Sequence, residues 1–522
     1  MDKIYATLAT LTLTLSLGAN ALAQTTKHDS LVVDSSSTTA KPSPSPSPAP
    51  PQGAPKAPKQ LKLGKVNVNG SLRLRAESYG WFDTPGFDDS YTFGAAQLRL
   101  SLSQQRERWD WLVEGEFPVL FNLPERAAAP APRGQLGLGA SYSAANGSQD
   151  ASAVLKQAYV KARGLFGDPR GSLKVGRFEF VDGAETTPKD ATLAALKREH
   201  VAHRLLGNFG FSHVGRSFDA VQYVRDNKSS NFTFVGGRAV EGVFQLRALK
   251  ELDVDFWYGA YTKPLHSKKA ESEFRIFNLL YHDGRGALKT DNRTAAARRL
   301  DAENIRIDTV GGHYIAAVRT KRGTLDLLAW GAGQFGRWGA LAHRAGAGTF
   351  EAGFQPSGAL ARVKMWARAG YFRSTGDGDP TDARHGTFFQ VLPTPRVYAR
   401  FPFYNLMNSE DAFAQLSLKP HARIALRADV HALRLSSARD LWYSGGGAFQ
   451  ETTFGYQGRS SGGRRSLGTL FDLSADLNVT PTTTLTFYGA GVRGGGVASG
   501  IYPAGGANPT ARFLYAELTK RF

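Results

Sequence analysis

Apolar and polar residues alternate along most of the chain from residue 66 onward, over stretches of eight to twelve residues. In the first stretch Val66, Val68, Leu72 and Leu74 share one face, whereas Asn, Ser and Arg occupy the other. Side chains of a β-strand point to alternate faces, so this period of two predicts strands with one apolar and one wet side. About 16 to 18 such segments occur, each near the ~9–11 residues that a tilted membrane strand needs. The pattern predicts an all-β protein, a transmembrane antiparallel β-barrel.

Short and long connections separate these segments. Residues 106–108 and 481–483 are predicted to be periplasmic turns. Long stretches rich in Gly, Asp and Pro are predicted to be extracellular loops, over residues 124–152, 182–215, 284–302, 374–408 and 436–465. This asymmetry is typical of outer-membrane barrels. Within the second loop, apolar residues near helical spacing predict a short helix over 191–206, either inside the lumen or on its rim.

The N-terminal region predicts export. Asp2 and Lys3 precede an apolar run that ends in Ala21-Leu22-Ala23, as in a secretory signal peptide over residues 1–23. Residues 24–62 are rich in Ser and Pro and are expected to form a disordered periplasmic leader, because they cannot bury apolar surface. Residues 63–522 form the predicted barrel, which we expect in the bacterial outer membrane.

The net charge of the chain limits the classes of partner that it can bind. The 522 residues carry a formal charge of +19, and residues 1–62 contribute only +3, which leaves +16 for the barrel. Such an excess indicates an acidic partner, and export argues against nucleic acid. The chain has no cysteine, which excludes a disulfide framework and a thiolate metal site.

The wet face of the strands is rich in basic residues. Guanidinium groups bind carboxylates with two-pronged geometry, so rows of them would make a path for an acidic sugar. Barrel interiors are also held together by ion pairs, which is the alternative for each single residue. The basic candidates are Arg73, Arg75, Arg99, Lys161, Arg163, Arg362, Lys364, Arg368, Arg423 and Arg427. The acidic partners on the same face are Glu77, Asp429, Asp472 and Asp476.

Two regions resemble the alginate-export family of outer-membrane barrels. The first is Leu173-Lys-Val-Gly-Arg177-Phe-Glu-Phe together with Val214-Gly-Arg216-Ser-Phe-Asp219, and the second is the acidic stretch over 374–389. The resemblance extends over about residues 66–522. It implies a monomeric barrel of 18 strands with an electropositive constriction, which delivers a polyuronate with periplasmic export components as partners. It also adds Arg177, Arg216 and Asp219 to the lumen set.

Two groups of residues are weak candidates for metal sites. Asp377, Asp379 and Asp382 offer oxygen ligands to Ca²⁺ but lack the full twelve-residue loop pattern, so a turn rich in Asp and Gly is the alternative. His200 and His203 lack the helical zinc-protease spacing. We therefore expect no cofactor, with a structural Ca²⁺ as the one exception to consider.

Three functions compete at this stage. A passive channel for an anionic polysaccharide needs only a positive lumen, and it is the favoured interpretation. A general uptake porin for small acidic solutes has the same composition. A barrel enzyme needs a nucleophile, a base and an orienting group on one rim, and no spacing in the sequence singles out such a set. The expected partners are outer-membrane lipid and an acidic sugar or polysaccharide.

Overall fold

The computed structural model describes residues 61–227, 229–394, 398–502 and 508–522. The predicted signal peptide and nearly all of the predicted leader lie outside the described residues. Among the residues described, no helix combines the length and the apolarity that a membrane crossing requires.

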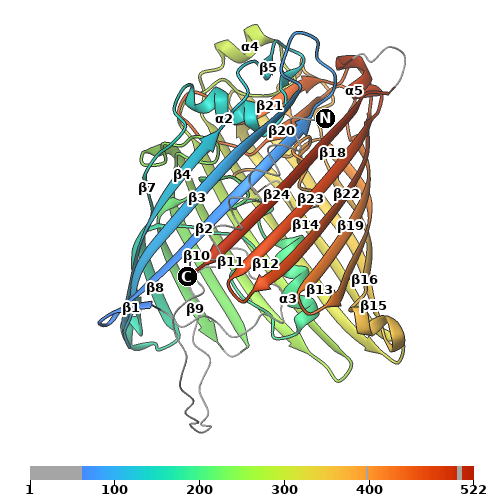
Figure 1. Cartoon of the computed structure of the whole chain (residues 1–522). Helices are drawn as coiled ribbons and strands as arrows, with labels where there is room; N and C mark the ends of the chain where they lie inside the picture. Colours follow the sequence, from blue (N-terminus) through green and yellow to red (C-terminus); the bar gives the residue numbers. More distant parts are fainter. Residues whose placement is uncertain (1–60, 228, 395–397, 503–507) are drawn as a thin grey trace, which may run out of the picture. The chain divides into compact units, whose positions relative to one another are not determined.

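In the described part of the chain, eighteen antiparallel strands form one closed barrel (Figure 1). Each strand pairs with the next, and the first pairs with the last, from Ser71 opposite Arg521 to Gly80 opposite Arg512, which closes the barrel. The strands are β2 (Val66–Gly80), β3 (Ser90–Gln105), β4 (Trp109–Phe121), β7 (Val154–Arg163), β8 (Gly171–Phe178), β9 (Phe218–Asn227), β10 (Ser230–Val240), β11 (Glu251–His266), β12 (Ala270–Asp283), β13 (Ile305–Thr320), β14 (Gly323–Trp338), β15 (Leu341–Pro356), β16 (Trp366–Ser374), β18 (Ser409–His421), β19 (Ile424–Leu435), β22 (Ser466–Thr480), β23 (Thr483–Gly494) and β24 (Thr510–Arg521). The predicted fold class and the expected 18 strands are confirmed.

Shorter elements lie at the ends of the barrel or in its loops. The short strands are β1 (Leu61–Leu63), which pairs with β2, β17 (Arg384–His385), which runs parallel to β15, and the pairs β5 (Ala128–Ala129) with β6 (Gly134–Gln135) and β20 (Leu441–Gly445) with β21 (Tyr456–Ser460). The helices are α2 (Leu138–Asn146), α3 (Ala191–Leu196), α4 (Ala295–Leu300) and α5 (Gly496–Ile501), the 3₁₀ turns η1 (Leu165–Gly167) and η3 (Gly358–Val363), and the π-helix η2 (Lys197–Val201).

The outer face of the barrel is apolar and the inner face is polar, as the alternation predicts. On β3, Leu100 and Leu102 are exposed, whereas Ser101 between them is buried against the interior. On the neighbouring β4, Val113 lies opposite Leu102 and is equally exposed. Lipid can solvate these outward side chains, while strand pairing satisfies the backbone polar groups of the wall.

The two ends of the barrel differ in their connections. The predicted turns at 106–108 and 481–483 join strands at one end, the short-turn end, although Thr483 already belongs to β23. The terminal Phe522 pairs with Gly70 at the same end. All five predicted long loops connect strands at the opposite end, the long-loop end. The residue pattern therefore predicted both kinds of connection correctly.

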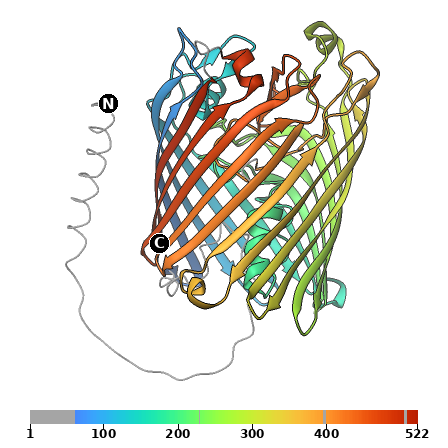
Figure 2. The same cartoon turned by 90° about the vertical axis from the view of Figure 1, so that its right-hand side faces the viewer.

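One long connection does not stay at the rim. Residues 179–217, here called the lumen insert, run into the barrel, and Figure 2 shows α3 inside the wall near the short-turn end. The Asp190 carboxylate caps α3 by accepting a hydrogen bond from the Leu193 N–H. It also accepts a hydrogen bond from the Arg319 guanidinium, near the end of β13. The predicted helix is confirmed over 191–201, but Ala202 is extended and His203 has a positive φ of 71°, so the helix ends before residue 206.

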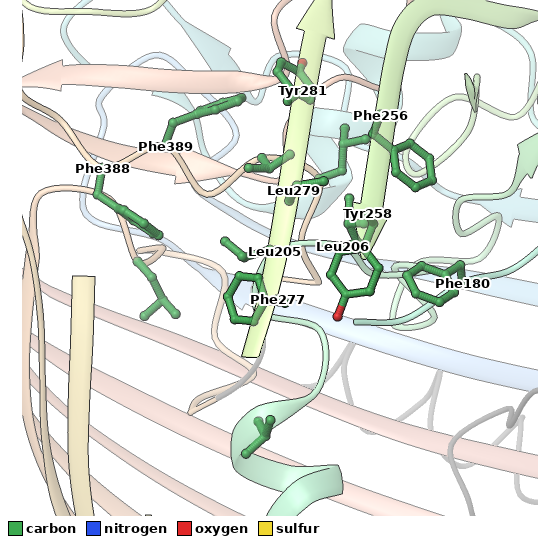
Figure 3. Packing of buried hydrophobic residues seen from close by; sticks show 14 of the residues in the cluster. Phe180, Leu205, Leu206, Phe256, Tyr258, Phe277, Leu279, Tyr281, Phe388 and Phe389 are labelled. Carbon is green, nitrogen blue, oxygen red and sulfur yellow. The ribbon is translucent and has the colours of Figure 1, made fainter. Parts of the chain in front are cut away.

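Apolar packing fills the middle of the barrel. Leu205 and Leu206 of the lumen insert lie among Phe277 of β12 and Phe389 of the loop between β16 and β18, all in one buried cluster (Figure 3). Leu206 and Leu392 form a parallel bridge between these two segments. The loops therefore pack on each other and on the wall as a second layer, inside the cylinder.

Candidate functional site

The lumen wall carries basic side chains that are paired with carboxylates. The Arg75 Nη2 atom lies 2.6 Å from Glu517 Oε2, and Arg99 Nη2 lies 3.3 Å from Glu179 Oε2. Arg163 pairs with Asp110 across neighbouring strands. These charges are thus balanced by carboxylates of the wall and, at Glu179, of the lumen insert, which agrees with the ion-pair alternative raised for single residues.

Glu351 on β15 is the centre of the most deeply buried ion network. Its carboxylate lies 3.0 Å from Arg368 Nη2 on β16, 3.4 Å from Arg204 Nη2 and 2.9 Å from His200 Nδ1 of the lumen insert. Arg368 also pairs with Asp326. The side chains of this network are at most 1% exposed, so their charges hold the insert to the wall and do not face water.

Two further pairs tie the lumen insert to β12. Lys197 Nζ lies 2.6 Å from Glu273 Oε1, and Arg275 Nη2 lies 2.7 Å from Glu185 Oε1. All four side chains are nearly inaccessible to solvent. Removing one partner of such a pair leaves the other charged and buried, which is strongly unfavourable. The insert is therefore held in this position by charge as well as by apolar packing.

Arg216 joins three loops at the centre of the barrel. Its guanidinium donates to the carbonyls of Gly207, Leu392, Pro393 and Gly446, at 2.7–3.1 Å. Burial lowers the pKa of Arg216 to about 10, so the group stays charged at neutral pH. Its role in the structure is to satisfy backbone carbonyls that the folded loops would otherwise leave without partners.

The candidate metal residues do not converge. Asp377, Asp379 and Asp382 each accept a backbone N–H two residues further on, at 2.9–3.1 Å, as in Asx turns. His203 faces Thr394, and burial lowers its pKa to about 4, which keeps the ring neutral at pH 7. Within the described ranges, no three His, Asp or Glu side chains are grouped to hold a metal ion.

A partly open cluster of charges lies near the short-turn end. Arg198 and Glu199 of η2 pair at 2.5 Å, and Lys419 of β18 interacts electrostatically with both. Although burial alone would raise it, the neighbouring Arg198 and Arg427 lower the pKa of Glu199, so its carboxylate is charged at neutral pH. We call this group the mouth cluster, and its members are Arg198, Glu199, Lys364, Lys419, Arg427, Asp429, Asp472 and Asp476.

The mouth cluster has four basic and four acidic members, but Asp429, which lies 2.7 Å from Arg427, is only 1% exposed, whereas the arginines reach solvent. The Arg198 and Arg427 side chains are 33% and 25% exposed, in contrast to the buried network around Glu351. Guanidinium groups that reach solvent can bind carboxylates with two-pronged geometry. This is therefore the part of the lumen best suited to meet an acidic solute.

Most of the predicted lumen residues face inward. These are Arg73, Arg75, Arg99, Lys161, Arg163, Arg368, Arg427, Glu77, Asp429, Asp472 and Asp476 on the wall, with Arg216 buried in the lumen insert. Their role in conduction stays a prediction.

The inward placement of five residues is wrong. Arg177 and Asp219 pair with each other at 2.6 Å on the outer face, where the neighbouring Val175 and Val221 also point. Arg362 and Lys364 belong to the turn that η3 forms, because β16 begins only at Trp366; neither lies on the inward face of a strand, and Lys364 joins the mouth cluster from the rim. Arg423 is exposed in the turn between β18 and β19.

Several functional candidates were missed in the sequence. On β18, Leu416 and Leu418 point outward, so the alternation of the strand predicts that Lys419 points inward. Arg198 had no such signal, because its place in the lumen depends on how the whole insert folds. The carboxylates of Glu351 and Asp326 lie on strands whose alternation also places them inward.

Comparison with known proteins agrees with this architecture. A family model described as alginate export matches residues 203–498, more than half of the chain. No curated protein sequence matches the chain significantly.

Solved structures with a similar fold are outer-membrane proteins. OpdK of Pseudomonas aeruginosa, solved with vanillate, is 8% identical, with a TM-score of 0.51 over 87% of this chain and 98% of that one. OccAB4 of Acinetobacter baumannii is 7% identical over 89% and 99% of the two chains, with a TM-score of 0.49. OccK9 (OpdG) of Pseudomonas aeruginosa is 10% identical over 87% and 98%, with a TM-score of 0.49. The likeness to OpdK shows a shared barrel fold.

Proposed function

The chain belongs to the alginate export family of outer-membrane proteins, and from this premise we propose that it passes an anionic polysaccharide of the polyuronate class through its lumen. The polymer enters at the short-turn end, which faces the periplasm. The observation that carries this proposal is the mouth cluster, where the Arg198 and Arg427 side chains are partly exposed while Asp429, the partner of Arg427, is buried. Arg binds carboxylates with two-pronged geometry, so Arg198 and Arg427 suit the repeated carboxylates of a polyuronate.

Passage requires the lumen insert to move. Leu205, Leu206 and Arg216 are completely buried between the wall and the loops that follow β16 and β19. In the proposed mechanism this packing opens before a polymer passes. We therefore infer a gated channel in which the insert leaves the axis of the barrel while the eighteen-stranded wall stays in place.

Uptake of small acidic solutes is the second candidate. The same buried loops favour it, because a small anion needs a smaller displacement of the insert than a polymer does. The family and the fold are those of outer-membrane channels, which supports either kind of transport over a barrel enzyme.

Ion selectivity and polymer block in planar bilayers test the proposal. We expect an anion-selective current that low concentrations of uronate oligomers block and that phosphate does not. The double variant Arg198→Glu/Lys419→Glu should weaken the block by about tenfold or more, because it reverses two charges of the mouth cluster. Phosphate block without polymer block would instead support uptake of small anions.

A matched control separates the mouth cluster from general charge. Arg108→Glu/Lys321→Glu makes the same change of net charge at the same end, on exposed turn residues. It should leave the block unchanged. If polymer blocks both double variants as it blocks the parent protein, the mouth cluster is not the entrance.

A further inference from the structure

A hollow lined by arginines lies on the outer wall at the long-loop end. Its volume is about 610 Å³, within the range of ligand-binding pockets. It spans the ends of β19, β22 and β23, and we call it the outer hollow. Its lining includes Arg434, Arg465, Arg493, Ser466, Gly468 and Thr469.

Small residues on β22 create the hollow. Ser466 lies opposite Arg434 of β19, and Thr469 lies opposite Arg493 of β23, so long side chains flank short ones. The pairing of β19 with β22 also shifts register beside Arg434. Such irregularities occur next to binding sites because they redirect side chains.

The charge of this region is not balanced by the protein. Glu410 of β18 is 4% exposed beneath three guanidinium groups, those of Arg434, Arg465 and Arg373, at 2.5, 2.8 and 3.6 Å. Arg493 has no carboxylate partner among the residues that the structure describes. Three arginines therefore share the Glu410 carboxylate and Arg493 adds a further positive charge, so a bound anion would relieve their mutual repulsion.

The outer hollow lies directly above lipid-facing surface. Phe471 of β22 and Phe487 of β23 point outward further along the same strands and are 58% and 51% exposed. A ligand here meets arginines at one end and apolar wall at the other. Arg at the membrane boundary recognises anionic headgroups, and it binds phosphate through a two-pronged pair of N–H donors.

We propose that the outer hollow binds the phosphorylated headgroup of a membrane lipid in the leaflet at the long-loop end, with its acyl chains lying on the wall below. A lipid fits better than a free anion, because the apolar surface continues from the arginines without a break. This inference requires only that the barrel lies in a membrane, so it does not depend on which solute the channel transports.

Native mass spectrometry of the full-length protein in detergent tests this site with diphosphoryl lipid A as the probe. We expect one tightly retained molecule, and at least tenfold weaker retention in Arg434→Gln/Arg493→Gln. Lipid A without its phosphates should bind weakly to the parent protein. Arg337→Gln, an exposed arginine on the outer face of β14 at the same end, serves as the matched control and should retain the lipid.

Several outcomes would overturn the inference. They are equal retention by the double variant, equal loss in the Arg337 control, or inorganic phosphate binding as tightly as the lipid. Arg434→Lys/Arg493→Lys keeps the charge but loses the forked geometry, so it should bind with intermediate strength if guanidinium–phosphate pairing is responsible. Polymer block in bilayers should be unchanged in all of these variants.

Discussion

Glu351 shows how a single carboxylate can hold the lumen insert to the barrel wall. Its negative charge compensates the positive charges of Arg204 in the lumen insert and Arg368 in the wall, at a site that is buried from solvent. We expect Glu351→Gln to destabilise the protein by about 3–5 kcal/mol, because a buried arginine would lose its counter-charge. A lower midpoint of thermal unfolding in detergent, followed by circular dichroism, would show this.

The matched control for this change is Glu271→Gln. Glu271 pairs with His266 at 2.5 Å at the exposed short-turn end, where ion pairs contribute little. Its midpoint should stay close to that of the parent protein. Equal midpoints for both variants would mean that the Glu351 network does not hold the insert.

At the residue scale, the alternation predicts the direction of a side chain only inside a strand and only in the correct register. Arg73 and Arg99 face inward because they lie on long, regular strands. Arg177 and Asp219 were placed in the lumen because of the motif that contains them. Each lies at a position of its strand whose side chain points outward. Arg362 was misplaced because the strand after it starts four residues later.

The lumen insert is the element on which conduction depends, and it can be locked chemically. Leu206 of the insert and Leu392 of the loop after β16 form a parallel bridge and are completely buried. Bridged positions have the Cα separation that a disulfide needs, and the chain has no cysteine of its own. In Leu206→Cys/Leu392→Cys we expect oxidation to suppress channel opening and reduction to restore it, measured as open probability in bilayers.

The single variant Leu206→Cys controls for the loss of leucine packing. It should respond to neither oxidation nor reduction. If the oxidised double variant opens as often as the reduced one, the insert does not have to separate from this loop, and the gating mechanism is wrong.

At the scale of elements, the strands and turns were predictable because their pattern is local. The insert was not, because its position depends on contacts distant in sequence. Arg73 donates to the Gly210 carbonyl 137 residues away, and Arg216 donates to the Gly446 carbonyl 230 residues away. The period of 3.6 indicated a helix in this loop but could not choose between the lumen and the rim.

For the whole molecule, the closed wall follows from the sequence because each membrane strand must have a partner on both sides. The filled interior does not follow from it. Aromatic residues of the long loops pack together at the long-loop end, with Phe82 and Tyr502 stacked at 5.0 Å and Phe403 against Trp442 at 5.8 Å. The mouth cluster lies toward the short-turn end, so the two ends of one lumen differ chemically.

This difference predicts that polymer acts from one side. Uronate oligomers added at the short-turn side should block at about tenfold lower concentration than from the long-loop side, because the partly exposed arginines of the mouth cluster lie at this end. Orientation in the bilayer can be assigned with Lys321→Cys, an exposed turn position, and a thiol reagent that cannot cross the membrane. Equal block from both sides would mean that the mouth cluster does not select the entering polymer, whereas stronger block from the long-loop side would reverse the proposed direction of entry.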